Sequence, residues 1–192
     1  AMRHADRGLE IAQLALRHRD SGVVGFDIAG AEAGFPPSRM QDAFDLLAAE
    51  FFPATIHAGE ADGLDSIRSA LTDGHALRLG HGVRLAEDIE ITREGEQQYA
   101  RLGRLAEWVK DRGIALETSP SSNLQTGAIA QWGDSLADHP LDLLYQLGFR
   151  VTVNTDNRLM SGTTLSRELA LVAEEFAYDL DDLLAFQLNA AE

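Results

Sequence analysis

The chain has 192 residues, of which 45% are hydrophobic, and its 31 Asp and Glu outnumber its 16 Lys and Arg to give a formal net charge of −15. Such acidity disfavours binding to nucleic acids or to anionic membranes, because both need a basic surface. The sequence lacks cysteine, which excludes disulfides and cysteine-ligated zinc. With no apolar run of membrane-spanning length, we expect a cytoplasmic protein without nucleic-acid or membrane partners.

Short apolar runs alternate along the chain with segments of helical periodicity. Runs that are apolar nearly throughout are typical of strands buried on both faces. They predict strands at residues 23–28, 54–57, 77–80, 114–117 and 151–154. The helical spacing of apolar residues predicts helices at 9–19, 38–49, 62–71, 97–112, 141–147, 165–175 and 180–189. Ser38 is the predicted N-cap of its helix, and Gly113 and Gly148 are predicted helix C-caps.

This alternation predicts an α/β fold with parallel strands. Five strands would suffice for a doubly wound sheet, in which ligands gather at one switch point. Here, however, polar groups follow most of the predicted strands, and a barrel brings all such strand ends to one face. We therefore expect a parallel (β/α)8 TIM-type barrel, of which this chain supplies about five strand–helix units.

A histidine ends the second predicted strand, and another directly follows the third. Thr55-Ile56-His57-Ala58-Gly59-Glu60 offers an imidazole, which suits zinc, and a carboxylate that can act as an acid or base. Taken alone, that spacing also fits a turn histidine and a solvated glutamate. His81 lies between two glycines in Leu79-Gly80-His81-Gly82, and alone it fits a structural histidine. The remaining histidines, His4, His18, His75 and His139, are predicted to be surface or packing residues.

Polar segments follow the other three strands. Asp156 ends Val153-Asn154-Thr155-Asp156 and is either a turn residue or a metal ligand. Gly30, in Asp27-Ile28-Ala29-Gly30-Ala31-Glu32, can bring a bare backbone amide against a flat ligand. The segment Glu117-Thr118-Ser119-Pro120-Ser121-Ser122-Asn123 either lines a pocket or simply builds a loop.

These five motifs occur in an order, and at strand ends, that resembles the zinc-dependent adenosine deaminases of the amidohydrolase superfamily. The resemblance covers essentially the whole chain. It implies one Zn²⁺ per complete site and hydrolysis of a purine nucleoside, adenosine, to inosine and ammonia. The implied zinc ligands are His57 and Asp156. Glu60 would donate a proton to N1 of the purine, His81 would orient or deprotonate the attacking hydroxide, and the Gly30 amide would hydrogen-bond N3.

Two features depart from that family's pattern. The family has two further zinc ligands in a His-x-His motif on its first strand, and this sequence has no His-x-His. We expect the motif to lie upstream, so that residues 1–192 are the carboxyl-terminal part of a single barrel domain and are inactive in isolation. Asn157 stands where most members have an aspartate that contacts N7, and its NH₂ group can donate to N7 instead.

Two alternatives remain open at this point. One is deamination of a different 6-aminopurine, such as adenine, aminofutalosine or an N6-substituted nucleotide. The other is a non-catalytic binding relative, which the presence of Glu60 and His81 disfavours.

Overall fold

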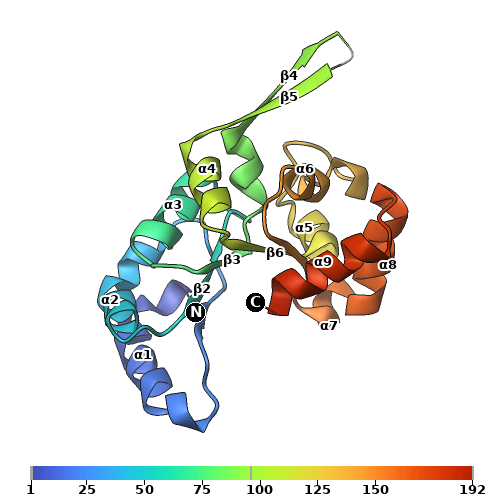
Figure 1. Cartoon of the computed structure of the whole chain (residues 1–192). Helices are drawn as coiled ribbons and strands as arrows, with labels where there is room; N and C mark the ends of the chain where they lie inside the picture. Colours follow the sequence, from blue (N-terminus) through green and yellow to red (C-terminus); the bar gives the residue numbers. More distant parts are fainter. Residues whose placement is uncertain (1, 96, 192) are drawn as a thin grey trace.

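The computed structural model describes residues 2–95 and 97–191, and within them a parallel sheet forms the centre of the molecule (Figure 1). Its strand order is β1-β2-β3-β6-β7, with every neighbouring pair parallel. The bounds are β1 Phe26–Ile28, β2 Ala54–Ala58, β3 Arg78–His81, β6 Ala115–Thr118 and β7 Val151–Val153. The predicted strands, their direction and their sequential order are confirmed, although β1 and β7 are shorter than expected.

Helices connect these strands and cover the sheet, as the sequence periodicity indicates. The α-helices are α1 Gly8–Arg17, α2 Gln41–Ala49, α3 Leu64–Thr72, α4 Arg104–Asp111, α5 Pro120–Thr126, α6 Leu141–Gln146, α7 Arg158–Ser161, α8 Leu165–Phe176 and α9 Leu180–Ala191. Short 3₁₀ segments lie at Met2–Arg7, Arg19–Ser21, Pro37–Met40, Val83–Asp88 and Leu136–Asp138. In Figure 1, α1 and α2 lie beside the first strands and α8 and α9 beside the last ones.

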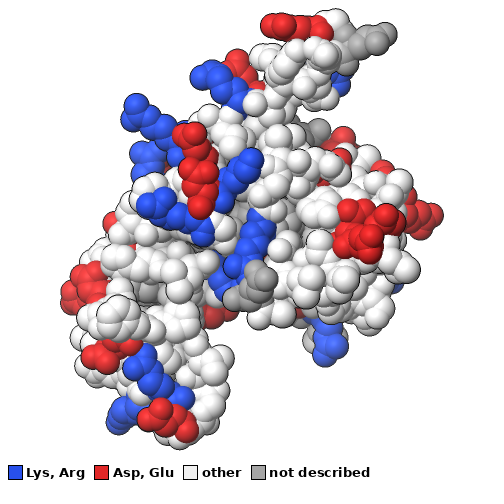
Figure 2. Space-filling model, viewed as in Figure 1, with Lys and Arg blue, Asp and Glu red and all other residues white. Residues whose placement is uncertain are grey.

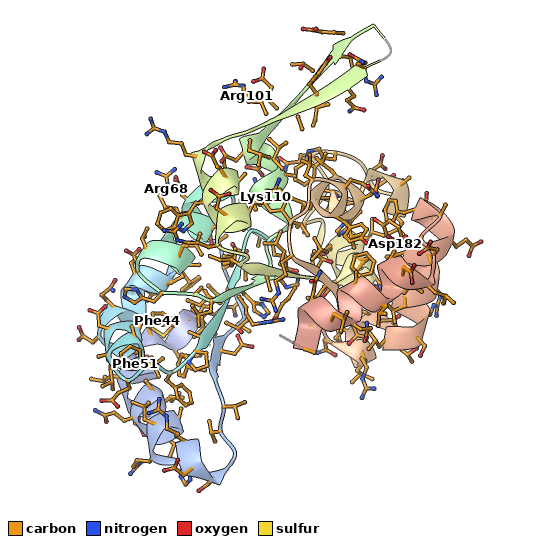
Figure 3. The ribbon with its side chains drawn as sticks, in the orientation of Figure 1. Phe44, Phe51, Arg68, Arg101, Lys110 and Asp182 are labelled. Atoms are coloured by element: carbon orange, nitrogen blue, oxygen red, sulfur yellow. The ribbon has the colours of Figure 1, made fainter. Side chains whose placement is uncertain are left out.

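The core lies between the sheet and these helices. The strands contribute Ile56, Leu79, Leu116 and Val151, all of which are fully buried. Phe44 of α2 packs edge-on against Phe26 of β1 with 6.0 Å between ring centroids, and Figure 3 shows it on the inner side of its helix. Burial of these side chains is the main driving force that fixes the strand ends in space.

The segment predicted as a helix over 97–112 is the main error in the sequence-based assignment. Only α4 is helical there. Residues Gln97–Leu102 form β5, which pairs antiparallel with β4, Ile89–Glu94, around a turn in which Gly95 has φ +64°. The apolar residues of β5 continue the spacing of α4, which mimics one long helix. The hairpin projects away from the sheet (Figure 1).

Smaller differences concern helix ends. Ser38 is not an N-cap: it lies inside the 3₁₀ turn Pro37–Met40, where no side-chain cap bond forms. Gly113 and Gly148 do end helices, since both have positive φ and donate to carbonyls of the preceding helix. The helices α5 and α7 were not predicted, because both are short and α5 is largely polar.

Charged side chains of both signs are scattered over the face seen in Figure 2. Among the described residues, no helix combines the length and the apolar character needed to cross a membrane.

Candidate active site

A small pocket of about 150 Å³ opens at the carboxyl ends of the parallel strands. Four strand ends, those of β2, β3, β6 and β7, contribute to it. Its lining residues are His57, Gly80, His81, Glu117, Ser119, Asn154 and Asp156. The structure thus brings together the three motifs that contain His57, His81 and Asp156, and the segment after β6 lines the pocket as well.

The position of His57 depends on a glycine in the neighbouring strand. The register of β2 and β3 places His57 opposite Gly80. A Cβ atom at Gly80 would lie 2.4 Å from His57 Cδ2. The imidazole therefore uses space that any other residue type would fill. Its ring meets that of His81 edge-on, with centroids 5.0 Å apart.

Two of the pocket residues have an unusual backbone conformation. His81 has φ +66° and Asp156 has φ +52°, both in the left-handed region. Such a conformation costs about 1 kcal/mol or more for a residue with a Cβ, and it persists where the surroundings enforce it. Both residues line the pocket, His81 from the end of β3 and Asp156 from the segment after β7.

Glu60 lies beside His81 at the top of β2. Its Oε2 atom is 3.3 Å from His81 Nε2, and its side chain is largely buried. Burial raises the pKa of the Glu60 carboxyl, and a hydrogen bond with Thr126 acts in the opposite direction. Burial, followed by the nearby His57, lowers the pKa of His81 to about 4. The pair is thus suited to a carboxyl that can hold a proton beside a neutral imidazole.

A second glutamate, Glu32, shapes the loop that carries Glu60. Its carboxylate is only 2% exposed. It accepts hydrogen bonds from the backbone N–H groups of Gly59, Glu60 and Ala61 at 2.6, 3.0 and 2.7 Å, and from Ser66 Oγ at 2.6 Å. The three N–H groups lie in the turn that follows β2 and Ser66 lies in α3, so this carboxylate fixes the backbone from which the Glu60 side chain extends.

Asp156 is held by a hydroxyl group from the segment after β6. Ser122 Oγ donates to Asp156 Oδ2 at 2.6 Å. One carboxylate oxygen is therefore oriented by the protein, and Oδ1 remains for another partner.

The donor atoms at this site suit zinc, which binds imidazole nitrogen and carboxylate oxygen. Atoms of His57, Glu60 and His81 lie within 4.8 Å of one another. Asp156 lies outside that group but lines the same pocket as the two histidines. A catalytic zinc needs three protein ligands and an open position. The assignment of His57 and Asp156 to two of these places remains a prediction.

Three predicted site residues do not line this pocket. One is Glu60, which lies beside it in contact with His81. Gly30 follows β1 with φ +115° and is exposed. Asn157 caps α7, where its Oδ1 accepts from the Met160 N–H at 3.2 Å. The Nδ2 group of Asn157 stays available as a donor. Their assignment as purine contacts remains a prediction.

Sequence reasoning missed several residues that support the site. The motifs that contain Glu32 and Ser122 predict no role for these two residues, and the space that Gly80 leaves for the His57 ring was not predicted. His139 is a buried packing residue, one of the two predicted alternatives, but its bond to Asn123, which in turn contacts His81, was not predicted. His139 and Asn123 are 16 positions apart in the sequence, and Asn123 and His81 are 42 apart, so no local sequence pattern predicts these contacts.

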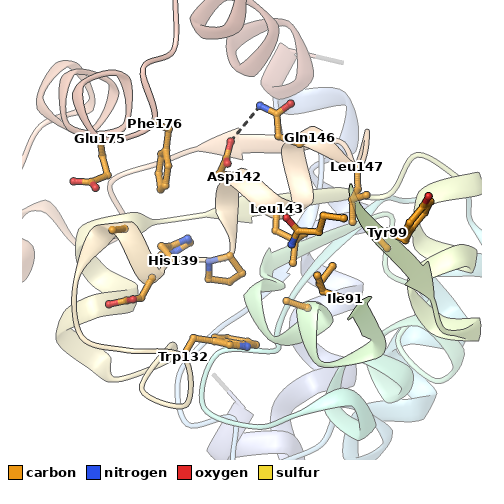
Figure 4. A pocket seen from close by; sticks show the side chains of 16 residues that line it. Ile91, Tyr99, Trp132, His139, Asp142, Leu143, Gln146, Leu147, Glu175 and Phe176 are labelled. Carbon is orange, nitrogen blue, oxygen red and sulfur yellow. Dashed lines mark hydrogen bonds between the residues drawn. The ribbon is translucent and has the colours of Figure 1, made fainter. Parts of the chain in front are cut away.

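A larger cavity, of about 700 Å³, lies elsewhere, between the β4–β5 hairpin, α6 and the end of α8. Figure 4 shows Ile91 and Tyr99 of the hairpin facing Leu143 and Leu147 of α6. His57, His81 and Asp156 do not line it, so its size does not identify it as the reaction site.

Comparison with known proteins agrees with the site geometry. The profile of the family described as adenosine deaminase matches residues 1–192. Adenosine deaminase 1 of Streptomyces coelicolor is 59% identical over 190 residues, covering 99% of this chain and 46% of that protein. Adenosine deaminase of Mycolicibacterium vanbaalenii is 57% identical, over 99% of this chain and 51% of that protein. The chain thus spans about half the length of these curated relatives.

Solved structures give the same fold. A zinc-bound amidohydrolase from Burkholderia ambifaria superposes with a TM-score of 0.79 over 96% of this chain and 47% of that one, at 24% identity. A complex of the protein ADAL with IMP gives a TM-score of 0.76 over 97% and 48%, at 25% identity. Because the family profile spans the whole sequence and relatives above half identity share its name, the chain belongs to the adenosine deaminase family, and its five parallel strands are part of that family's (β/α)8 barrel.

Proposed function

We propose that residues 1–192 are the carboxyl-terminal part of one (β/α)8 domain, and that the completed enzyme hydrolyses adenosine to inosine and ammonia. The completed enzyme is here the protein that joins this chain to the preceding barrel strands. The observation that carries the proposal is the meeting of His57, Glu60, His81 and Asp156 at the carboxyl ends of β2, β3 and β7. Support comes from relatives named adenosine deaminase at 55 to 59% identity.

His57 and Asp156 are the proposed ligands of one Zn²⁺, together with ligands supplied upstream. Zinc in such a site lowers the pKa of water to about 7 and so makes a nucleophile available at neutral pH. The zinc-bound neighbour supports this choice of metal for the shared fold. The chain's own contribution is to hold the two ligand side chains, through the space at Gly80 and the hydroxyl of Ser122.

The residues around the ligands have distinct proposed tasks. Purine C6 is a weak electrophile until N1 is protonated, and Glu60, whose pKa is raised by burial, is the group proposed to donate that proton. Water then adds to C6 and the C6–O bond forms. One proton of the water passes to N6, the C6–N6 bond breaks and N6 leaves as ammonia, while the second proton of the water returns to the Glu60 carboxylate. The Gly30 amide and Asn157 Nδ2 are the proposed donors to N3 and N7. His81 lies next to Glu60 and faces the attacking oxygen.

We propose adenosine, and not another 6-aminopurine, as the substrate because the more similar relatives are named adenosine deaminase. Neighbours of about 24–25% identity include an adenine deaminase from Arthrobacter aurescens and an N6-methyl-AMP deaminase from Arabidopsis thaliana. Their shared fold keeps the alternative substrates worth testing. A purine nucleoside or nucleotide is the expected small-molecule partner in each case.

The test is a substrate panel. The completed enzyme, loaded with zinc, is assayed for ammonia release from adenosine, adenine, aminofutalosine and N6-methyl-AMP. The proposal predicts that adenosine has the highest kcat/KM. A higher value for another member of the panel would replace the substrate, and no release from any of them would favour a non-catalytic relative.

A further inference from the structure

A chain of buried hydrogen bonds links the backbone of α6 to His81. The Leu141 N–H donates to His139 Nδ1 at 3.0 Å. His139 Nε2 lies 3.1 Å from Asn123 Oδ1, and Asn123 Nδ2 lies 2.9 Å from His81 Nδ1. The three side chains are 3%, 0% and 3% exposed. With water excluded, each of these polar atoms depends on the partner it has in the chain.

In each of these hydrogen bonds, only one of the two atoms can be the donor. A backbone N–H can only donate, so His139 Nδ1 must accept from Leu141. The ring hydrogen of His139 then sits on Nε2 and is donated to Asn123 Oδ1. In a doubly protonated His139, the Nδ1–H would point at the Leu141 N–H, and two donors at 3.0 Å would repel each other. The observed geometry therefore excludes a doubly protonated His139.

A second backbone group independently confirms which end of the Asn123 amide is oxygen. The Ser119 N–H donates to Asn123 Oδ1 at 3.2 Å. Two donors, Ser119 N–H and His139 Nε2–H, therefore converge on the same atom. The amide nitrogen is left facing His81, and it can only donate to Nδ1.

We propose that Asn123 and His139 are positioning residues that hold His81 in its Nε2–H form, so that His81 presents a hydrogen-bond donor to the reaction site. The Nδ1 lone pair of His81 accepts the Asn123 hydrogen, so the ring's own hydrogen lies on Nε2. That atom is the one 3.3 Å from Glu60 Oε2. The inference deepens the proposed function and rests on it for its catalytic consequence.

This form of the ring decides between the roles open to His81. A nitrogen that carries a hydrogen has no lone pair for a metal ion, which removes His81 from the three-residue group of possible ligands. For the same reason Nε2 cannot take up a proton from water. His81 therefore orients the attacking oxygen by donating to it and does not act as the base.

The first test reads the tautomer directly in the unmodified chain. The ¹⁵N shifts and long-range ¹H couplings of His81 in uniformly ¹⁵N-labelled protein distinguish a protonated from an unprotonated ring nitrogen. We expect a protonated Nε2 and an unprotonated Nδ1. A hydrogen on Nδ1, or on both nitrogens at neutral pH, overturns the proposal. This readout needs no turnover, so it stands apart from the fate of the proposed function.

The second test reverses the donor. Asn123→Asp keeps the shape but replaces the NH₂ group with an acceptor, which draws a hydrogen to His81 Nδ1. In the completed enzyme we expect kcat for adenosine to fall about 10²-fold with KM unchanged, the size typical of losing one donor to the reacting oxygen. The ¹⁵N spectrum should show the hydrogen at Nδ1.

Asn189→Asp is the matched control. Asn189 Nδ2 also donates a partly buried hydrogen bond, to Val151 O at 2.8 Å, but this bond lies away from the site. The control variant should leave the His81 tautomer and kcat unchanged. An equal loss of kcat in both variants would assign the effect to packing and overturn the positioning role. An unchanged tautomer in Asn123→Asp would overturn it too.

Discussion

The imidazole of His57 lies in the space that a side chain at Gly80 would occupy, since a Cβ there would be 2.4 Å from His57 Cδ2. The two residues face each other across β2 and β3. The glycine in Leu79-Gly80-His81-Gly82 thus serves the histidine of the other strand, and the proposed zinc ligand depends on both motifs.

The first prediction follows from this contact. Gly80→Ala should displace the His57 ring and weaken zinc binding by the completed enzyme at least about 10-fold, the low end of the range for losing support of a metal ligand. Competition with a chelator of known affinity measures it. Gly25→Ala is the control, because a Cβ there meets nothing closer than Pro53 O at 3.5 Å. Equal zinc affinity in Gly80→Ala and the unaltered protein would contradict the prediction.

The second prediction concerns the proposed acid. Glu60→Gln keeps the side-chain shape but removes its ionisable proton. The kcat of the completed enzyme should fall about 10²-fold or more, the usual range for general acid catalysis, while zinc stays bound. Glu107→Gln on the exposed face of α4 serves as the control. Near-normal turnover in Glu60→Gln would mean that another group protonates N1.

The third prediction concerns the carboxylate beneath the Glu60 loop. Glu32→Gln replaces one acceptor oxygen with an NH₂ group, which then faces N–H or O–H donors in a buried site. The unfolding free energy should fall by about 1 to 3 kcal/mol. Amide exchange at residues 59–61 should accelerate.

The comparison for this variant is Glu168→Gln. Glu168 is equally buried and accepts from Ser121 N, Ser121 Oγ and Thr163 Oγ1. Glu168→Gln should lose a comparable free energy of unfolding. Amide exchange should accelerate near residue 121 and stay unchanged at residues 59–61. If both variants accelerate exchange at the same amides, Glu32 does not specifically stabilise the loop at residues 59–61.

The fourth prediction is a pH dependence of stability. Burial lowers the pKa of His139 from 6.5 in the unfolded chain to about 3. Below its unfolded pKa the unfolded chain therefore binds a proton that the native state does not. This contribution to stability is present above about pH 6.5 and is lost progressively as the pH falls towards the folded value.

Urea unfolding at a series of pH values measures this effect. From about pH 6 to about pH 5, the unaltered chain should lose about 1 kcal/mol more stability than a His139→Gln variant. The exposed His75 gives the matched control, and His75→Gln should keep the slope of the unaltered chain. Identical slopes in the His139→Gln variant and the unaltered chain would show that His139 is not held neutral.

Strand order and the convergence of motifs were predictable because buried parallel strands leave a strong local signal. The apolar runs around Ile56, Leu79 and Val153 fix where polar groups must emerge. The hairpin over Ile89–Leu102 was missed because Tyr99 and Leu102 happen to continue the helical spacing of α4. The support by Glu32, Asn123 and His139 depends on side chains that meet only after the strands have assembled, so it left no pattern in the sequence.

The central claim, that the ends of β2 and β7 share one metal in a deaminase site, is tested most directly by locating zinc in crystals of the completed enzyme. Anomalous scattering at the zinc absorption edge identifies the ion and its ligands. The account predicts a single site in which a His57 ring nitrogen and an Asp156 carboxylate oxygen lie about 2 Å from zinc, with His81 outside the bonding distance. A fully occupied site that excludes either His57 or Asp156, or one in which His81 Nε2 binds the ion, would contradict it.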